Sequence, residues 1–124
     1  MNPNDCSGRT LAFLGDAVWS LVVRNYLLEE GTNNSKELQR LSISYVSAKS
    51  QAHYYNVLHE EGFFNETEEG HFHRGRNSNA GSHPHNTDVG TYRISTGFEA
   101  ILGYLYLEQK WDRIGEIWNK VRTI

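Results

Sequence analysis

Apolar residues along this chain recur mostly at spacings of three and four, which is the period of an α-helix. In the first segment the apolar stripe contains Leu11, Leu14, Val18 and Leu21. Alternation of the kind that strands show does not extend over a useful length. We therefore expect an all-α fold of five to seven helices, with helical segments at residues 10–28, 35–41, 47–62, 91–109 and 111–121.

Residues 65–90 interrupt this pattern. They include few aliphatic side chains and many Gly, Asn, Ser and His residues, a composition typical of exposed loops. We expect one domain over residues 1–124 that carries this stretch as a loop insertion. After it, Gly97 and Gly103 each cost a helix about 1 kcal/mol relative to alanine. They predict that another helix packs very closely there.

Composition narrows the class of protein. The chain has 124 residues, 38% of them hydrophobic, and its apolar runs are shorter than the roughly 20 residues of a membrane span. We expect no membrane partner. The opening residues show no secretory or transit signal, and the single Cys6 fits a reducing compartment. We expect a cytoplasmic protein, with an organelle such as a plastid as the alternative if a presequence has been removed.

Charge is unevenly distributed, although the net charge is only −3 and gives no hint of a polyanionic partner. Five glutamates and no lysine or arginine lie between Glu60 and Glu69. This acidic block is expected to be a solvated face. The basic and polar residues follow it, between Gly70 and Arg93.

Two isolated carboxylates are the candidates for chemistry. Asp16 lies among small and apolar residues, and Glu99 is the only charged residue between Ser95 and Leu107. If their helices pack together, two oxygen ligands from two helices would suit Mg²⁺, which keeps several waters. The alternatives are a solvated acid at Asp16 and a structural pair with an arginine or tyrosine at Glu99.

The basic segment offers donors for phosphate groups. The candidate RNA-binding residues are Arg74, Arg76, Asn77, Asn79, Ser82, His83 and His85. The histidine pairs His71/His73 and His83/His85 would also suit zinc or nickel in an extended segment. A solvated surface loop is the alternative to both.

Four motifs in order resemble the ribonuclease III catalytic domain, and more closely its short relatives, the Mini-ribonucleases III. FLGDAV and FEAILGYLYL match the two acidic motifs of the family. The segments LQRLSISYVSAKSQA and RGRNSNAGSHPHNTDVGTYR are similar to segments of the short relatives. Larger family members surround their metal with four acids, whereas two of the corresponding positions here hold Ala12 and Thr96. Asp16 and Glu99 are the remaining matches.

The resemblance implies a Mg²⁺-dependent endoribonuclease that cleaves double-stranded RNA and leaves 5′-phosphate ends, with Mn²⁺ as a substitute ion. Asp16 and Glu99 would be the catalytic residues and the metal ligands. It also implies a homodimer in which Phe13 is inserted into the partner, and a precursor of large-subunit ribosomal RNA as the substrate. No separate RNA-binding domain is expected after residue 124. Two rival hypotheses remain, a non-catalytic helical dimer that binds structured RNA and a metal-binding module built on the histidine pairs.

Overall fold

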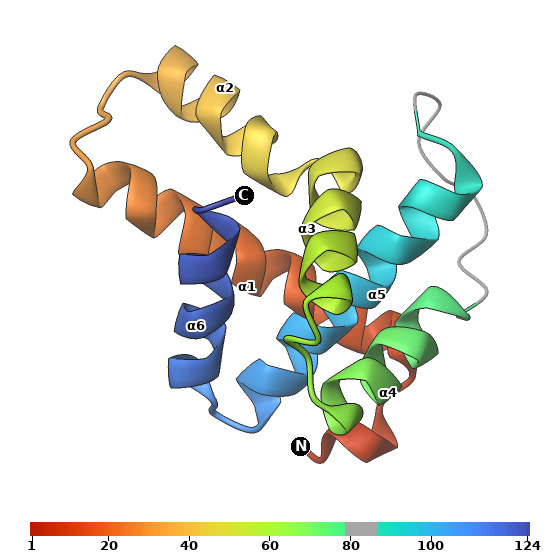
Figure 1. The fold of residues 1–124 in the computed structure, drawn as a ribbon. Coiled ribbons are helices and arrows are strands. Elements are labelled where there is room, and N and C mark those ends of the chain that lie inside the picture. The colour runs from red at the N-terminus through yellow and green to blue at the C-terminus, as the bar shows by residue number, and fades with distance from the viewer. Residues whose placement is uncertain (79–86) are drawn as a thin grey trace.

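Helices account for all the regular structure in the described part of the chain, residues 1–78 and 87–124 of a computed structural model. A short 3₁₀-helix, η1 (Pro3–Asp5), precedes six α-helices (Figure 1). They are α1 (Gly8–Glu29), α2 (Ser35–Val46), α3 (Ala48–Glu60), α4 (Glu66–Arg76), α5 (Val89–Leu107) and α6 (Trp111–Val121). The predicted all-α fold class is confirmed.

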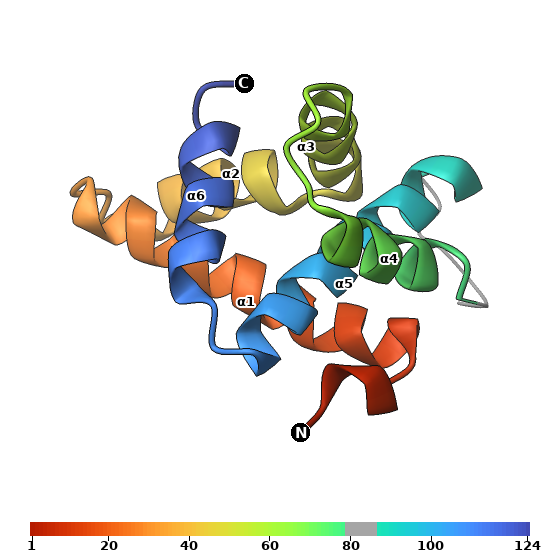
Figure 2. The same ribbon diagram turned by 60° about the horizontal axis from the view of Figure 1, so that its bottom comes forward.

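Helix α5 is the centre of the fold. It packs against α1, α3, α4 and α6, while α2 packs against α1 and α3. In both views α4 and α6 lie on opposite sides of the molecule, with α5 between them (Figure 1, Figure 2). Ten residues of α5 are buried, which explains why this segment is so poor in charged side chains.

Glycines let α1 and α5 approach one another very closely. A Cβ atom on Gly15 would lie 1.7 Å from the backbone oxygen of Glu99, and one on Gly103 would lie 2.0 Å from that of Leu11. Because only glycine avoids these clashes, the two backbones are in direct contact at the level of Asp16 and Glu99. The close packing that Gly103 predicted is confirmed, and Gly97 similarly faces the Phe72 ring.

The core includes aromatic residues that the predicted stripe of the first helix omitted. Trp19 is fully buried, packs edge-on against Phe98 and Trp118, and donates a hydrogen bond from Nε1 to the Tyr45 carbonyl. Leu21 was predicted to be in the stripe, but it is exposed. The buried face is therefore rotated from the predicted one, because the large Trp19 ring directs it toward α5 and α6.

The prediction of a loop over residues 65–90 was wrong for residues 66–76, which form α4. Asn65 caps this helix in a capping box with Glu68. The buried Phe72 ring stacks on Tyr55 with 3.6 Å between ring centroids. A cap and one buried aromatic face thus stabilise a helix whose composition resembles that of a loop.

The length and composition of helix α1 are relevant to the expectation that the protein has no membrane partner. By length and composition it is long and apolar enough to cross a membrane, although its individual apolar runs are short. The same properties belong to a central helix of a helical domain, and α1 packs against α2, α4 and α5 in that way. The expected lack of a membrane partner stays a prediction.

Candidate active site

Asp16 and Glu99 line one hollow on the surface, with a volume of about 240 Å³. Asp16 is exposed on α1, whereas Glu99 is partly buried on α5. Their side chains are close enough to share a hydrogen bond. The glycine contacts described above bring the two helices together here, so the two isolated carboxyl groups of the sequence meet in space.

The surroundings of Glu99 disfavour its charged form. Burial, followed by the hydrogen bond to Asp16 and the negative charge of that residue, raises the pKa of the Glu99 carboxyl to about 8. The hydrogen bond from Gln51 acts in the opposite direction and lowers this pKa. At neutral pH the pair therefore holds a proton that a divalent cation would displace on binding.

Gln51 lies behind Glu99 and is only 1% exposed. Its Nε2 donates to the Val46 carbonyl at 3.0 Å and to Glu99 Oε2 at 3.3 Å. Gln51 was not among the residues predicted from the sequence. The signal was present, because Gln51 is a polar residue at helical spacing from the apolar Tyr55 and Leu58.

The hollow has the oxygen chemistry that suits Mg²⁺. Its carboxylates are Asp16 and Glu99, and the remaining lining residues are Arg9, Ala12, Phe13, Tyr92 and Thr96. Ala12 and Thr96 thus line the same hollow, where larger ribonuclease III enzymes were expected to carry two more acids. The Thr96 hydroxyl donates to the Tyr92 carbonyl, one turn back along α5. Two carboxyl groups beside an open hollow of about 240 Å³ fit an ion that retains part of its water shell.

The candidate RNA-binding residues fall into three groups. Arg76 and Asn77 are exposed at the end of α4 and hydrogen-bond to each other. Arg74 is half-buried and donates to the Cys6 and Pro3 carbonyls, so its guanidinium fastens the N-terminal segment to α4. The remaining four, Asn79, Ser82, His83 and His85, lie outside the described residues.

The first histidine pair does not share one face. His71 is buried and stacks on Tyr104, while His73 is exposed on α4. A helix separates residues two apart by about 200°, whereas the predicted metal pair needed an extended segment. No group of three metal-ligating side chains occurs in the described ranges, and the pair His83/His85 falls beyond them.

The acidic block is not simply a solvated face. Glu68 is buried and forms two hydrogen bonds of 2.8 Å with Arg113 of α6. Glu69 bonds to Tyr55 and His59, and Glu61 contacts Lys120 at 3.0 Å. These contacts tie α4 and the end of α3 to the rest of the fold. The expectation was wrong for Glu68, which is buried, and for Glu69, which is partly buried, whereas Glu61 is exposed as expected.

An apolar face of α1 is left uncovered next to Asp16. Phe13 is 73% exposed, and Leu21 and Leu28 are more than half exposed. These residues lie on one side of the helix together with Ala17. A row of exposed large apolar side chains is typical of a protein interface.

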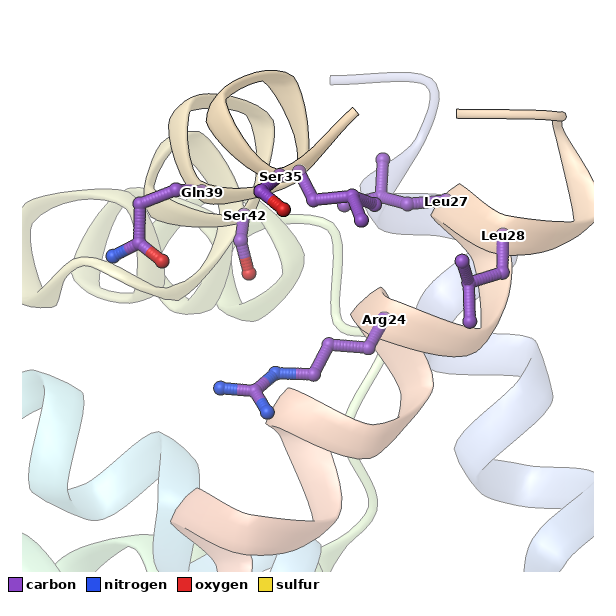
Figure 3. Close-up of a pocket in the computed structure, with 7 residues that line it drawn as sticks. Arg24, Leu27, Leu28, Ser35, Gln39 and Ser42 are labelled. Carbon is purple, nitrogen blue, oxygen red and sulfur yellow. The ribbon is translucent and has the colours of Figure 1, made fainter. Parts of the chain in front are cut away.

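A roomier hollow of about 320 Å³ lies between α1 and α2. Figure 3 shows it with Arg24, Leu27 and Leu28 on one side and Ser35, Gln39 and Ser42 on the other. Its lining contains no carboxylate or histidine. It therefore offers no group for metal or acid–base chemistry, and the smaller Asp16–Glu99 hollow is the candidate active site.

Comparison with known proteins agrees with the geometry. Residues 9–110 match the family model of the ribonuclease III domain. Mini-ribonuclease 3 of Streptococcus pneumoniae is 42% identical over 111 residues, covering 90% of this chain and 87% of the relative. Mini-ribonuclease 3 of Staphylococcus aureus is 42% identical over 115 residues, covering 93% and 86%.

A solved structure is also similar to this one. The crystal structure of a Fusobacterium nucleatum protein superposes with a TM-score of 0.84 at 36% identity, and the match covers 93% of this chain and 92% of that one. The family match spans α1 to α5 and includes both Asp16 and Glu99. The chain therefore belongs to the ribonuclease III domain family, among the Mini-ribonucleases 3.

Proposed function

We propose that this chain is a Mg²⁺-dependent endoribonuclease that cleaves double-stranded RNA and leaves 5′-phosphate ends. The observation that carries the proposal is the meeting of Asp16 and Glu99 from two helices in one surface hollow. The names of its relatives support ribonuclease activity. Maturation of the large-subunit ribosomal RNA precursor, in the cytoplasm, is the role that we propose for it.

Asp16 and Glu99 would hold Mg²⁺, or Mn²⁺ in its place. When bound there, such an ion would supply a nucleophilic water and would stabilise charge on the scissile phosphate. Glu99 must lose its proton to act as a ligand, and Gln51 favours that loss by donating to its carboxylate. Thr96 and Ala12 leave room beside the two acids, since neither brings a carboxylate into the hollow.

RNA contacts are proposed for the exposed end of α4 and the segment that follows it. Arg76 and Asn77 are exposed there and face solvent. Asn79, Ser82, His83 and His85 are proposed from composition. Arg74 is a weaker candidate for RNA binding than the sequence indicated, because the Pro3 and Cys6 carbonyls already accept hydrogen bonds from its guanidinium.

We propose that the protein works as a homodimer with α1 at the interface. Phe13 and Leu21 leave an apolar face of α1 open to solvent in the single chain. A second copy would cover this face by two-fold symmetry and place Phe13 beside the partner's helix. Phe13 also lines the candidate active site, so the interface would border the hollow.

Incubation of the purified protein with a long RNA duplex, in Mg²⁺ or in EDTA, tests the proposal. Cleavage only with Mg²⁺ is the expected result. Retardation of an intact duplex in both conditions would instead support the rival hypothesis, a non-catalytic dimer that binds RNA. Tight zinc binding without RNA affinity would support the histidine module.

A further inference from the structure

Gln51 has a buried acceptor atom with no partner in the protein. Among the buried side chains of the described residues, its Oε1 is the polar atom without a hydrogen bond. A buried acceptor that makes no hydrogen bond costs about 1 to 3 kcal/mol, so native proteins rarely leave one unpaired. This atom lies beside the candidate active site, because the same amide group contacts Glu99.

The orientation of the amide is fixed by chemistry. The Val46 carbonyl can only accept a hydrogen bond, so the NH₂ group and not the carbonyl oxygen of Gln51 must face it. One N–H is then directed to Val46 and the other to Glu99 Oε2. Val46 is the last residue of α2, and the Trp19 indole anchors the adjacent Tyr45 carbonyl. The amide is therefore held by a rigid corner between α2 and α3.

We propose that Gln51 is a positioning residue for the metal site, in which its N–H holds Glu99 and its Oε1 accepts from a water molecule that hydrates the bound ion. This inference rests on the proposed function. Mg²⁺ keeps several waters, and each of them is a strong donor that needs an acceptor. Residues that hold ligands or waters in this way typically change metal affinity 10- to 100-fold when they are replaced.

Titration of Mn²⁺ into the full-length protein without RNA tests this role. Gln51→Met keeps the length of the side chain and removes both the donor and the acceptor. Gln39→Met makes the same change at an exposed position of α2 and is the matched control. We expect Gln51→Met to weaken Mn²⁺ binding by at least about tenfold, and Gln39→Met to leave it unchanged.

Different results of this titration would refute the role of Gln51 and the proposed nuclease function. If the parent binds Mn²⁺ and cleaves duplex RNA, but Gln51→Met binds Mn²⁺ with parental affinity, Gln51 has only a structural role and the inference is wrong. If the parent neither binds Mn²⁺ nor cleaves duplex RNA, the proposed function itself is wrong. A structural role would lower the melting temperature of Gln51→Met without changing Mn²⁺ affinity at a temperature where the variant is folded.

A second measurement does not depend on the folding of a variant. In a crystal of the parent protein with Mn²⁺, we expect a water molecule within about 3.2 Å of Gln51 Oε1 that also contacts the ion. A bound ion with no water at Oε1 would overturn the inference.

Discussion

Replacement of Gly15 by alanine tests how the backbone contact between α1 and α5 supports both the fold and the site. The new Cβ would lie 1.7 Å from the Glu99 carbonyl oxygen, whereas ordinary contacts are 3.4 Å or longer. The helices must therefore separate locally by roughly 1.5 to 2 Å. The atom that is displaced belongs to Glu99 itself, so the same shift moves one of the two carboxylates.

The expected change in the free energy of unfolding of Gly15→Ala has two opposing contributions. Overpacking of a tight interior costs about 1 to 3 kcal/mol or more, and a Gly→Ala change inside a helix returns about 1 kcal/mol. Because the clash at 1.7 Å is with a backbone atom, the cost lies at the upper end of this range, about 3 kcal/mol. We expect a net loss of about 2 kcal/mol in the free energy of unfolding, or a melting temperature lower by roughly 8 °C for a domain of this size. A displacement of about 1 Å at reacting groups can lower the cleavage rate roughly 100-fold.

Gly115→Ala is the matched control. Gly115 lies inside α6, and a Cβ built on it meets nothing within 4 Å. The same substitution should therefore raise stability by up to about 1 kcal/mol and leave cleavage unchanged. Thermal melts followed by circular dichroism, at one fixed protein concentration, compare the two variants with the parent. A Gly15→Ala protein that melts at or above the parental temperature would refute the reasoning.

Four further predictions concern pH, the dimer and the RNA-binding segment. Because the pKa of Glu99 is raised to about 8, Mg²⁺ must displace a proton below that pH, and its affinity should rise about tenfold per pH unit up to pH 8 and then level off. Mg²⁺ titrations between pH 6 and 9 measure this dependence, and an affinity that does not change with pH contradicts it. In the metal-free protein, protonated Glu99 stabilises the fold because its pKa is raised above the ordinary value of 4.5. This contribution to the free energy of unfolding is complete below pH 4.5 and is lost as the pH rises toward 8. Glu99→Gln should remove this decline from melting curves measured over the same pH range. Phe13→Ala should weaken dimerisation by about 2 to 4 kcal/mol; sedimentation should show monomer at concentrations where the parent is dimeric, and an unchanged dimer places the interface elsewhere. Exchange of residues 79–86 for a Gly-Ser linker should weaken duplex binding and reduce its salt dependence, with melting temperature as the control; parental affinity and salt slope would mean that the RNA is bound by other residues.

Local signals in the sequence were sufficient to predict several elements. Ser47 was expected to begin a helix, and its side chain does accept from the Ser50 backbone N–H. Gly31 was expected in a turn, and it has a φ of 91° that favours glycine. The lone carboxylates Asp16 and Glu99 were expected to meet if their helices packed closely. The requirements of Ser47 and Gly31 are local and do not depend on distant parts of the chain, whereas the meeting of Asp16 and Glu99 also needed α1 and α5 to pack together.

Features that depend on tertiary contacts were predicted less well. Helix α4 has a loop-like composition and is stabilised by contacts with residues far away in the sequence, such as that of Glu68 with Arg113. The buried face of α1 is decided by Trp19, whose partners come from α5 and α6. Gln51 contacts Glu99 across 48 residues of sequence, a distance over which helical periodicity carries no information. These positions are set by packing between elements and not by local propensity.

The most direct test of the central claim compares duplex RNA cleavage by the parent, Asp16→Asn and Glu99→Gln at saturating Mg²⁺. Each change removes the charge of one carboxylate and keeps the size of the side chain, while Cys6→Ser serves as a control at a residue that does not line the hollow. Circular dichroism and sedimentation establish that the variants retain the parental fold and assembly. The account predicts that both carboxylate variants lose nearly all cleavage and that Cys6→Ser keeps it. Retention of a tenth or more of the parental turnover by both carboxylate variants would contradict the assignment of Asp16 and Glu99 as the active site.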